Sequence, residues 1–110
     1  MIKSERSGNV EVVTLEIDTI NALVADEIRK EVSGMFENGT SRMVINLKGV
    51  KYIDSSGFGC LLAITRSAKN NFGTVIFCNI EPEVQKVLEM LHLHTVFNIC
   101  SSLEESINSF

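Results

Sequence analysis

The chain has 110 residues, 45% of them hydrophobic, and a formal net charge of −4 at pH 7. This length and composition suit one core, so we expect residues 1–110 to form a single domain. The basic residues form no cluster, whereas a nucleic-acid partner would require a basic face that displaces counterions from phosphates. We therefore expect no nucleic-acid binding and a protein partner instead.

Targeting and redox features point to the cytoplasm. Residues 1–6 become charged at once, and no apolar run approaches the roughly 20 residues that a membrane span needs. Cys60, Cys78 and Cys100 sit singly among apolar neighbours, without the paired spacing of a zinc site. We expect a soluble cytoplasmic protein that makes no membrane contact and whose cysteines are reduced core residues.

The first third of the chain predicts a hairpin followed by a helix. The β-branched residues over 10–17 favour a strand, and residues 2–5 are expected to pair with it through a turn at 7–9. From 21 to 38 the apolar residues recur at spacings of three and four, which is typical of an amphipathic helix. Asn21 is its expected N-cap.

The rest of the chain alternates between strands and helices. Apolar runs at 43–47 and 74–78 predict buried strands, and a helical pattern follows each of them. The second of these helices begins at Pro82, and a weak strand at 96–99 and a last helix from about Ser102 follow it. The predicted apolar stripe of the Pro82 helix consists of Val84, Val87, Leu88 and Leu91. We predict an α/β fold with a central mixed β-sheet, helices packed against it and an N-terminal hairpin.

The candidate functional site is the segment Asp54-Ser55-Ser56-Gly57-Phe58-Gly59, which separates a strand-like run from an amphipathic helix. Aspartate and serine oxygens accept hydrogen bonds from the first free N–H groups of a helix, so the segment fits a helix N-terminus. Gly57 and Gly59 lower the helix propensity there, which indicates that another group approaches the turn closely.

Four interpretations of this turn compete, and the residues alone leave them open. The first is an ordinary capped helix. A nucleophilic serine is the second, but the Gly-x-Ser-x-Gly pattern is absent and nothing marks His92 or His94 as its base. A phosphoaspartate at Asp54 is the third, although the acidic pair that would hold magnesium is missing. The fourth is a serine modified by a partner kinase, because a helix N-terminus accommodates a phosphate.

The sequence resembles the STAS domain family, and specifically the stand-alone bacterial anti-sigma factor antagonists. The resemblance covers nearly the whole chain and is carried by residues 52–59 within their flanking hairpin, strands and Pro82 helix. It implies that the unphosphorylated protein binds an anti-sigma factor that is also a serine kinase, and thereby frees a sigma factor. Phosphorylation would end this binding and a phosphatase would reset it. By position, the implied phosphoacceptor is Ser55, with Ser56 as a second possibility.

The resemblance also implies roles for the neighbouring residues. Asp54 and Ser56 would shape the turn together with Gly57 and Gly59, and Phe58 stands where the family often has leucine. The family often carries Gly-x-Leu/Ile-Asp before the first helix, in a stretch that contributes to partner contact. Here that stretch reads Asp18-Thr19-Ile20-Asn21, so the negative charge has moved and the identity of the kinase partner is open.

The implied protein is not an enzyme and carries no cofactor and no metal, since ATP and magnesium would belong to the partner kinase. An alternative keeps the fold but makes the chain a constitutive STAS subunit of a larger assembly, such as a lipid-transport ABC complex or a stress-signalling particle. An enzyme with Ser55 or Cys60 as nucleophile is the third hypothesis. His92 and His94 are expected to be a surface or half-buried pair, because two ligands do not make a zinc site.

Overall fold

The computed structural model describes residues 1–110. Strands and helices alternate along most of the chain, as the sequence predicts. In chain order the elements are β1 (Ile2–Ser7), β2 (Val10–Leu15), β3 (Thr19–Ile20), α1 (Ala22–Glu37), β4 (Arg42–Asn46), β5 (Tyr52–Ile53), α2 (Ser55–Asn70), β6 (Thr74–Cys78), α3 (Pro82–Met90), β7 (Ile99–Cys100) and α4 (Leu103–Asn108).

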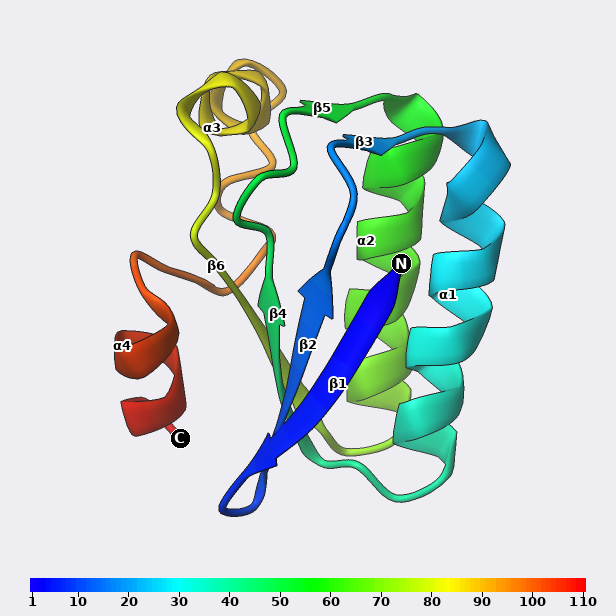
Figure 1. Cartoon of the computed structure of the whole chain (residues 1–110), viewed down its shortest axis with the longest axis vertical. Coiled ribbons are helices and arrows are strands. Elements are labelled where there is room, and N and C mark those ends of the chain that lie inside the picture. The colour runs from blue at the N-terminus through cyan, green and yellow to red at the C-terminus, as the bar shows by residue number, and fades with distance from the viewer.

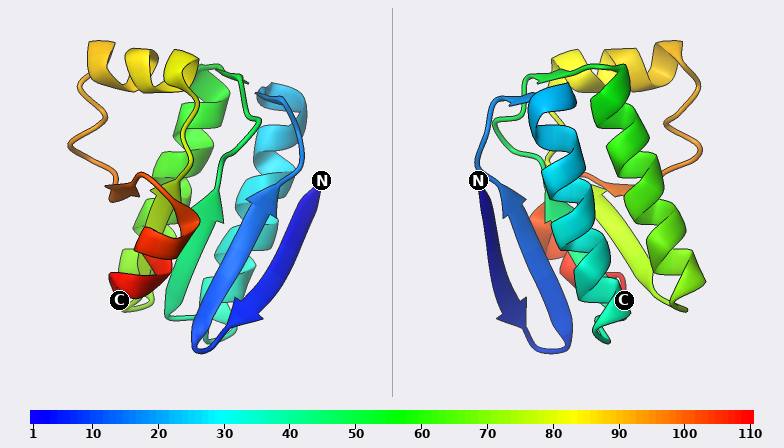
Figure 2. Two further views of the ribbon diagram at one scale, coloured as in Figure 1. Left: turned by 60° about the vertical axis from the view of Figure 1, so that its left-hand side comes forward. Right: turned by 90° about the vertical axis from the view of Figure 1, so that its right-hand side faces the viewer.

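The central sheet is mixed. Its strand order is β1-β2-β4-β6-β7, and only the β1–β2 pair is antiparallel. The long helices α1 and α2 lie side by side on one face of the sheet, and α4 covers part of the other face (Figures 1 and 2). β3 and β5 form a separate parallel pair beyond the carboxyl ends of the central strands. These features confirm the predicted α/β fold, including its N-terminal hairpin.

The hairpin forms one edge of the sheet. Gly8 adopts a positive φ of 63° in the two-residue turn between β1 and β2, a conformation that costs glycine little. The outer strand β1 is almost wholly exposed and carries Lys3, Glu5 and Arg6, which form ion pairs with one another or with Glu11 of β2. Charged side chains on an edge strand oppose pairing with a further strand.

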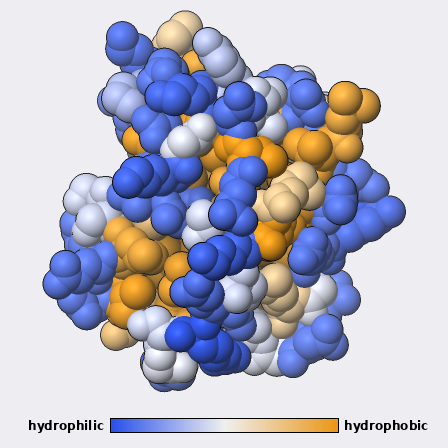
Figure 3. Space-filling model, in the orientation of Figure 1, coloured by the Kyte–Doolittle hydropathy of each residue, from blue (hydrophilic) through white to orange (hydrophobic).

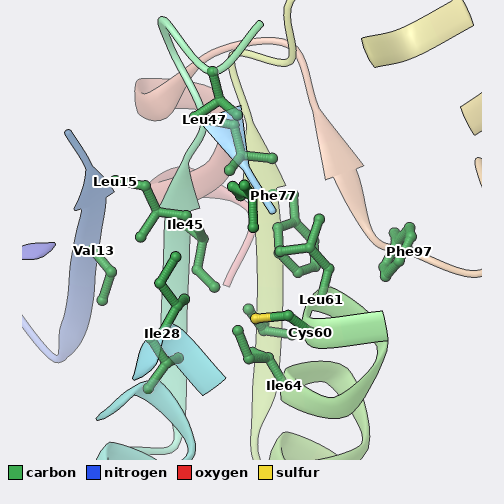
Figure 4. Packing of buried hydrophobic residues seen from close by; sticks show 14 of the residues in the cluster. Val13, Leu15, Ile28, Ile45, Leu47, Cys60, Leu61, Ile64, Phe77 and Phe97 are labelled. Atoms are coloured by element: carbon green, nitrogen blue, oxygen red, sulfur yellow. The ribbon is translucent and has the colours of Figure 1, made fainter. Parts of the chain in front are cut away.

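The main core fills the space between the sheet and the two long helices. Figure 4 shows Ile28 of α1, Ile64 of α2 and Ile45 of β4 pointing toward one another there. Near the end of the sheet that carries α3, the rings of Phe77 and Phe97 meet edge to face with centroids 5.2 Å apart. A smaller cluster on the opposite face joins Val10, Val12, Val44 and Cys78 to α4. β4 and β6 are therefore buried on both faces, which explains their nearly continuous apolar sequences.

Two details of the C-terminal half differ from the sequence prediction. Val84 and Leu88 of α3 are buried as expected, but Val87 is 37% exposed and Leu91 is 55% exposed, so the buried stripe is narrower than predicted. The last strand begins only at Ile99 instead of 96, because the N–H groups of residues 96 and 97 bond to the carbonyl of Leu93 in a turn.

The cysteine prediction holds for two residues. Cys60 and Cys78 are buried and Cys100 is half-buried, and all three are free thiols. No helix has both the length and the apolar character that crossing a bilayer requires.

The helices α1, α2 and α3 end in the same backbone motif, in which the residue after the cap has a positive φ. In α1 that residue is Gly39, but in α2 it is Phe72 with φ 58°, and in α3 it is His92 with φ 56°. After α2, Gly73 donates its N–H to the carbonyl of Ala68 at 2.7 Å, which closes the motif. Phe72 is 97% exposed, so its ring contributes almost no packing in return for this conformation.

Replacing Phe72 with glycine should therefore stabilise the protein. We expect the free energy of unfolding of Phe72→Gly to rise by about 0.5–1 kcal/mol, because a β-carbon is disfavoured at this φ by more than the added chain entropy of glycine costs. Urea unfolding followed by circular dichroism measures the change. The control Phe72→Ala keeps the β-carbon and should show no such rise. Equal stabilisation by both variants would contradict the explanation.

Candidate functional site

The candidate turn caps the long helix α2. Asp54 has an extended backbone, with φ −88° and ψ −174°, and its Oδ1 accepts a hydrogen bond from the N–H of Gly57 at 2.9 Å. The carbonyl of Asp54 accepts from the N–H of Phe58, also at 2.9 Å. Asp54 is thus the N-cap, and Ser55 and Ser56 are the first two helical residues.

A second turn lies against the first. The N–H of Asp54 donates to the carbonyl of Ile20 at 3.1 Å, one residue before the Asn21 cap of α1. Lys51 and Tyr52 both donate their N–H groups to the carbonyl of Asp18, at 2.8 and 3.1 Å. Together with the β3–β5 pairing, these bonds hold the starts of α1 and α2 side by side at one end of the molecule (Figure 1).

Gly57 is the residue that permits this approach. A β-carbon built on it would lie 2.5 Å from the carbonyl oxygen of Ile20 and 2.5 Å from Cγ2 of Ile53, which is closer than real contacts allow. The predicted steric demand is therefore confirmed at Gly57. It is wrong for Gly59, where a β-carbon would meet nothing within 4 Å.

The predicted site residues divide into an exposed set and a buried set. Asp54, Ser55, Ser56 and Gly59 are exposed, while Gly57 and Phe58 are buried. Asn21 is half-buried and caps α1 as predicted, since its Oδ1 accepts from the N–H of Leu23 at 3.0 Å. The chain thus brings all of the predicted residues to one end of the molecule.

A hollow of about 310 Å³ between α1 and α2 borders the turn on one side. It is lined by Ala22, Ala25, Asp26, Arg29, Ser56, Gly59 and Cys60. Arg29 donates a hydrogen bond to Asp26 at 2.6 Å, which lowers the pKa of that carboxyl, with a further contribution from Lys30. Burial raises the pKa of the Cys60 thiol to about 11. Cys60 is therefore protonated at neutral pH, which argues against it as a nucleophile.

A larger, mainly apolar groove of about 490 Å³ borders the turn on the other side. Its apolar lining comes from β5, α2 and α3 and consists of Tyr52, Ile53, Phe58, Val84 and Val87; Thr19, Asn21, Lys51, Asp54 and Glu83 complete it. Hydrophobic surface is visible between α3 and the β3–β5 pair in Figure 3. The sequence did not predict this groove. Val87 fits the apolar spacing of α3 as well as the buried residues do, so the spacing does not show that it is exposed.

Glu81 fixes the start of α3 beside the groove. Its Oε2 accepts a hydrogen bond from the N–H of Gly49 at 2.8 Å, and its Oε1 lies 3.9 Å from Nζ of Lys51. These contacts tie the start of α3 to the loop that leads into β5. The loop that leads into β5 and the turn therefore also holds α3, which forms one wall of the groove.

The two histidines take no part in the site. His92 and His94 are both exposed in the segment after α3, with ring centroids 6.4 Å apart. No group of three or more histidine, cysteine, aspartate or glutamate side chains is arranged to hold a metal ion.

The contrast between Gly57 and Gly59 gives a direct test of the close contact between the turn and Ile20. Gly57→Ala should lower the free energy of unfolding by about 1–3 kcal/mol, because the new methyl group overlaps a backbone oxygen. Gly59→Ala serves as the matched control and should raise it by about 0.5–1 kcal/mol, because alanine favours the helix and the site is open. Urea unfolding of both variants measures the difference. A neutral Gly57→Ala would show that the two turns separate easily.

Comparisons with known proteins agree with this fold. The family model described as "STAS domain" matches residues 1–106. BtrV of Bordetella bronchiseptica, a candidate anti-sigma factor antagonist, is 24% identical over 91 residues, which cover 83% of this chain and 78% of that protein.

Solved structures show the same fold. The crystal structure of a candidate anti-sigma factor antagonist from Thermotoga maritima has a TM-score of 0.86 at 21% identity and covers 98% of this chain and 92% of its own. The anti-sigma factor antagonist SpoIIAA of Bacillus has a TM-score of 0.73 in both its unphosphorylated form, at 21% identity, and its phosphorylated form, at 22%. Both forms match 99% of this chain, over 96% and 98% of their own. With a family model that spans nearly its whole length, the chain belongs to the STAS domain family.

Proposed function

We propose that this protein is an anti-sigma factor antagonist whose binding is switched off by phosphorylation of Ser55. In this proposal the unphosphorylated form binds an anti-sigma factor that is also a serine kinase, and so frees a sigma factor in the cytoplasm. A phosphatase restores the binding form. The chain itself is not an enzyme, since the kinase supplies ATP, magnesium and the catalytic groups.

The observation that carries the proposal is an exposed serine at the first position of a clamped helix. Ser55 follows the Asp54 cap directly, and the position of α2 is fixed through Gly57. A kinase can reach such a hydroxyl without unfolding the chain. The resemblance of residues 52–59 to the family motif, and the solved phosphorylated form of SpoIIAA, support the same assignment.

The local electrostatics favour a change of surface over a change of fold. A phosphate adds about −1.5 to −2 charge, and the N–H groups and dipole at a helix N-terminus accommodate such an anion. Asp54 already places one carboxylate at this position. The modified turn would therefore be strongly negative and hydrated, and a partner surface that fits the neutral serine would be repelled.

Ser55 is favoured over Ser56 by its surroundings. Ser56 lines the hollow between α1 and α2 together with Asp26 and Arg29, whereas Ser55 lines neither concavity. Both serines are exposed, but Ser55 lies outside the hollow that contains the Asp26–Arg29 ion pair, and for that reason we propose it as the phosphoacceptor.

Phosphorylation is tested with the anti-sigma kinase encoded in the same genome. After incubation with that kinase and ATP, mass spectrometry should find phosphate on Ser55. Ser55→Ala should bind the kinase as tightly as the wild type, because it keeps a small neutral side chain. Ser55→Asp should bind at least about tenfold more weakly, because it adds charge at the contact. Ser56→Ala is the matched control and should leave phosphorylation intact.

Two results would contradict the switch. One is the absence of phosphate on Ser55 with every such kinase, and the other is equal binding by the wild type and both Ser55 variants. Either result would favour the constitutive subunit of a larger assembly, in which the same surface makes a permanent contact.

The apolar groove beside the turn gives a second test of the same interface. We propose that the anti-sigma factor places an apolar side chain against Tyr52 and Val87, since both line the groove and are substantially exposed. Val87→Asp should weaken binding by at least about tenfold, because it puts a charge where an apolar contact is buried. Val96→Asp is the control, since Val96 is 48% exposed but lies outside the groove. Isothermal titration calorimetry measures both, and equal losses would exclude the groove.

A further inference from the structure

Two of the cysteines lie opposite each other on the last two strands of the sheet. Cys78 at the end of β6 and Cys100 at the end of β7 are registered partners in the parallel pairing of these strands. Neighbouring strands lie about 4.8 Å apart. This spacing falls within the range of roughly 4.4–6.8 Å between the α-carbons of residues joined by a disulfide.

Both side chains leave the sheet on the same face, because registered partners in neighbouring strands point to the same side. For Cys78 that face is the one covered by α4, since it packs with Val44 in the smaller cluster. The hydroxyl of Ser106, a fully buried residue of α4, lies beside the Cys78 thiol. Cys60 belongs to the main core on the opposite face and has no cysteine in reach.

We propose that Cys78 and Cys100 form a reversible oxidation site that reacts with a small-molecule disulfide and closes an intramolecular disulfide bond. This inference is independent of the proposed function, because neither thiol lines the turn or the groove. The sequence alone does not indicate this chemistry, because Cys78 and Cys100 lie far apart along the chain and resemble ordinary core residues.

The reaction proceeds by two thiol–disulfide exchanges. The Cys100 thiolate attacks one sulfur of oxidised glutathione, forms a mixed disulfide and releases one glutathione thiolate. The Cys78 thiol then loses its proton, and its sulfur attacks the Cys100 sulfur. The bond to glutathione breaks and the second glutathione leaves. Overall two protein thiols are oxidised to one disulfide, while one glutathione disulfide is reduced to two thiols.

The different surroundings of the two thiols set this order. Cys100 is half-buried and within reach of a small reagent, whereas Cys78 is fully buried. Burial also raises the pKa of Cys78, so this thiol is the poorer first nucleophile. Once Cys100 carries a glutathione, however, its sulfur lies next to Cys78, and no external reagent has to enter the core.

The bond would act at one edge of the sheet. β7 has only two residues and pairs with β6 at the edge of the sheet. The chain between the two cysteines contains α3. A disulfide between β6 and β7 would fix both ends of this segment and restrict it in the unfolded chain. Oxidation should thus stabilise the region that forms one wall of the apolar groove.

The test counts thiols in the 110-residue chain. After incubation with oxidised glutathione, acid quenching and alkylation under denaturing conditions, the free thiols should fall from three to one. Peptide mapping should find Cys60 alkylated and Cys78 joined to Cys100, and dithiothreitol should restore all three. The melting temperature of the oxidised monomer should rise by at least about 5 °C.

Variants provide the controls. Cys60→Ser should still form the bond, whereas Cys100→Ser should keep both of its thiols. A stable glutathione adduct on Cys100 with Cys78 free, a dimer linked through Cys100, or three unchanged thiols would each overturn the proposal. Because the decisive thiol count is made on the wild type, the result stands even where a variant folds poorly.

Discussion

The close approach of α2 to the backbone of Ile20 is the constraint on which the functional end of this molecule depends. The carbonyl oxygen of Ile20 accepts a hydrogen bond from the N–H of Asp54. The same oxygen lies so close to Gly57 that a β-carbon on that residue would overlap it. The starts of both long helices are thereby fixed relative to each other, and so are the concavities on either side of the turn. If Ser55 is phosphorylated, the charge of this surface would accordingly change while the backbone of the turn keeps its shape.

Local signals in the sequence predicted the local structure well. One physical reason that acts within a few residues explains each of the Asn21 cap, the glycine turn of the hairpin, the helix N-terminus at residues 54–56 and the proline start of α3. The sequence did not indicate that Asp54, and not a serine, caps α2. The role of Gly57 could also be predicted. A glycine in the first turn weakens a helix, so its presence there indicates that another group approaches the backbone closely. Its counterpart Gly59 carries the same local signal but faces open space.

Features that depend on tertiary contacts could not be predicted in this way. Val87 shares the helical spacing of Val84, and only the position of α3 beside β5 decides that Val84 is buried and Val87 lines a groove. The pairing of Cys78 with Cys100 depends on which strand occupies the edge of the sheet. The last strand begins at Ile99 and not at 96, because a turn at Leu93 uses the N–H groups of residues 96 and 97.

The charged edge strand β1 has a consequence for how the protein assembles with others. Lys3, Glu5 and Arg6 occupy a strand whose outer backbone groups are free, and desolvating those charges would oppose the growth of the sheet into a second molecule. The opposite edge is a strand of two residues, too short to serve as a template. Both edges of the sheet therefore oppose pairing with a strand of another molecule. The fold thereby lowers the tendency of the protein to polymerise through its sheet in a crowded cell.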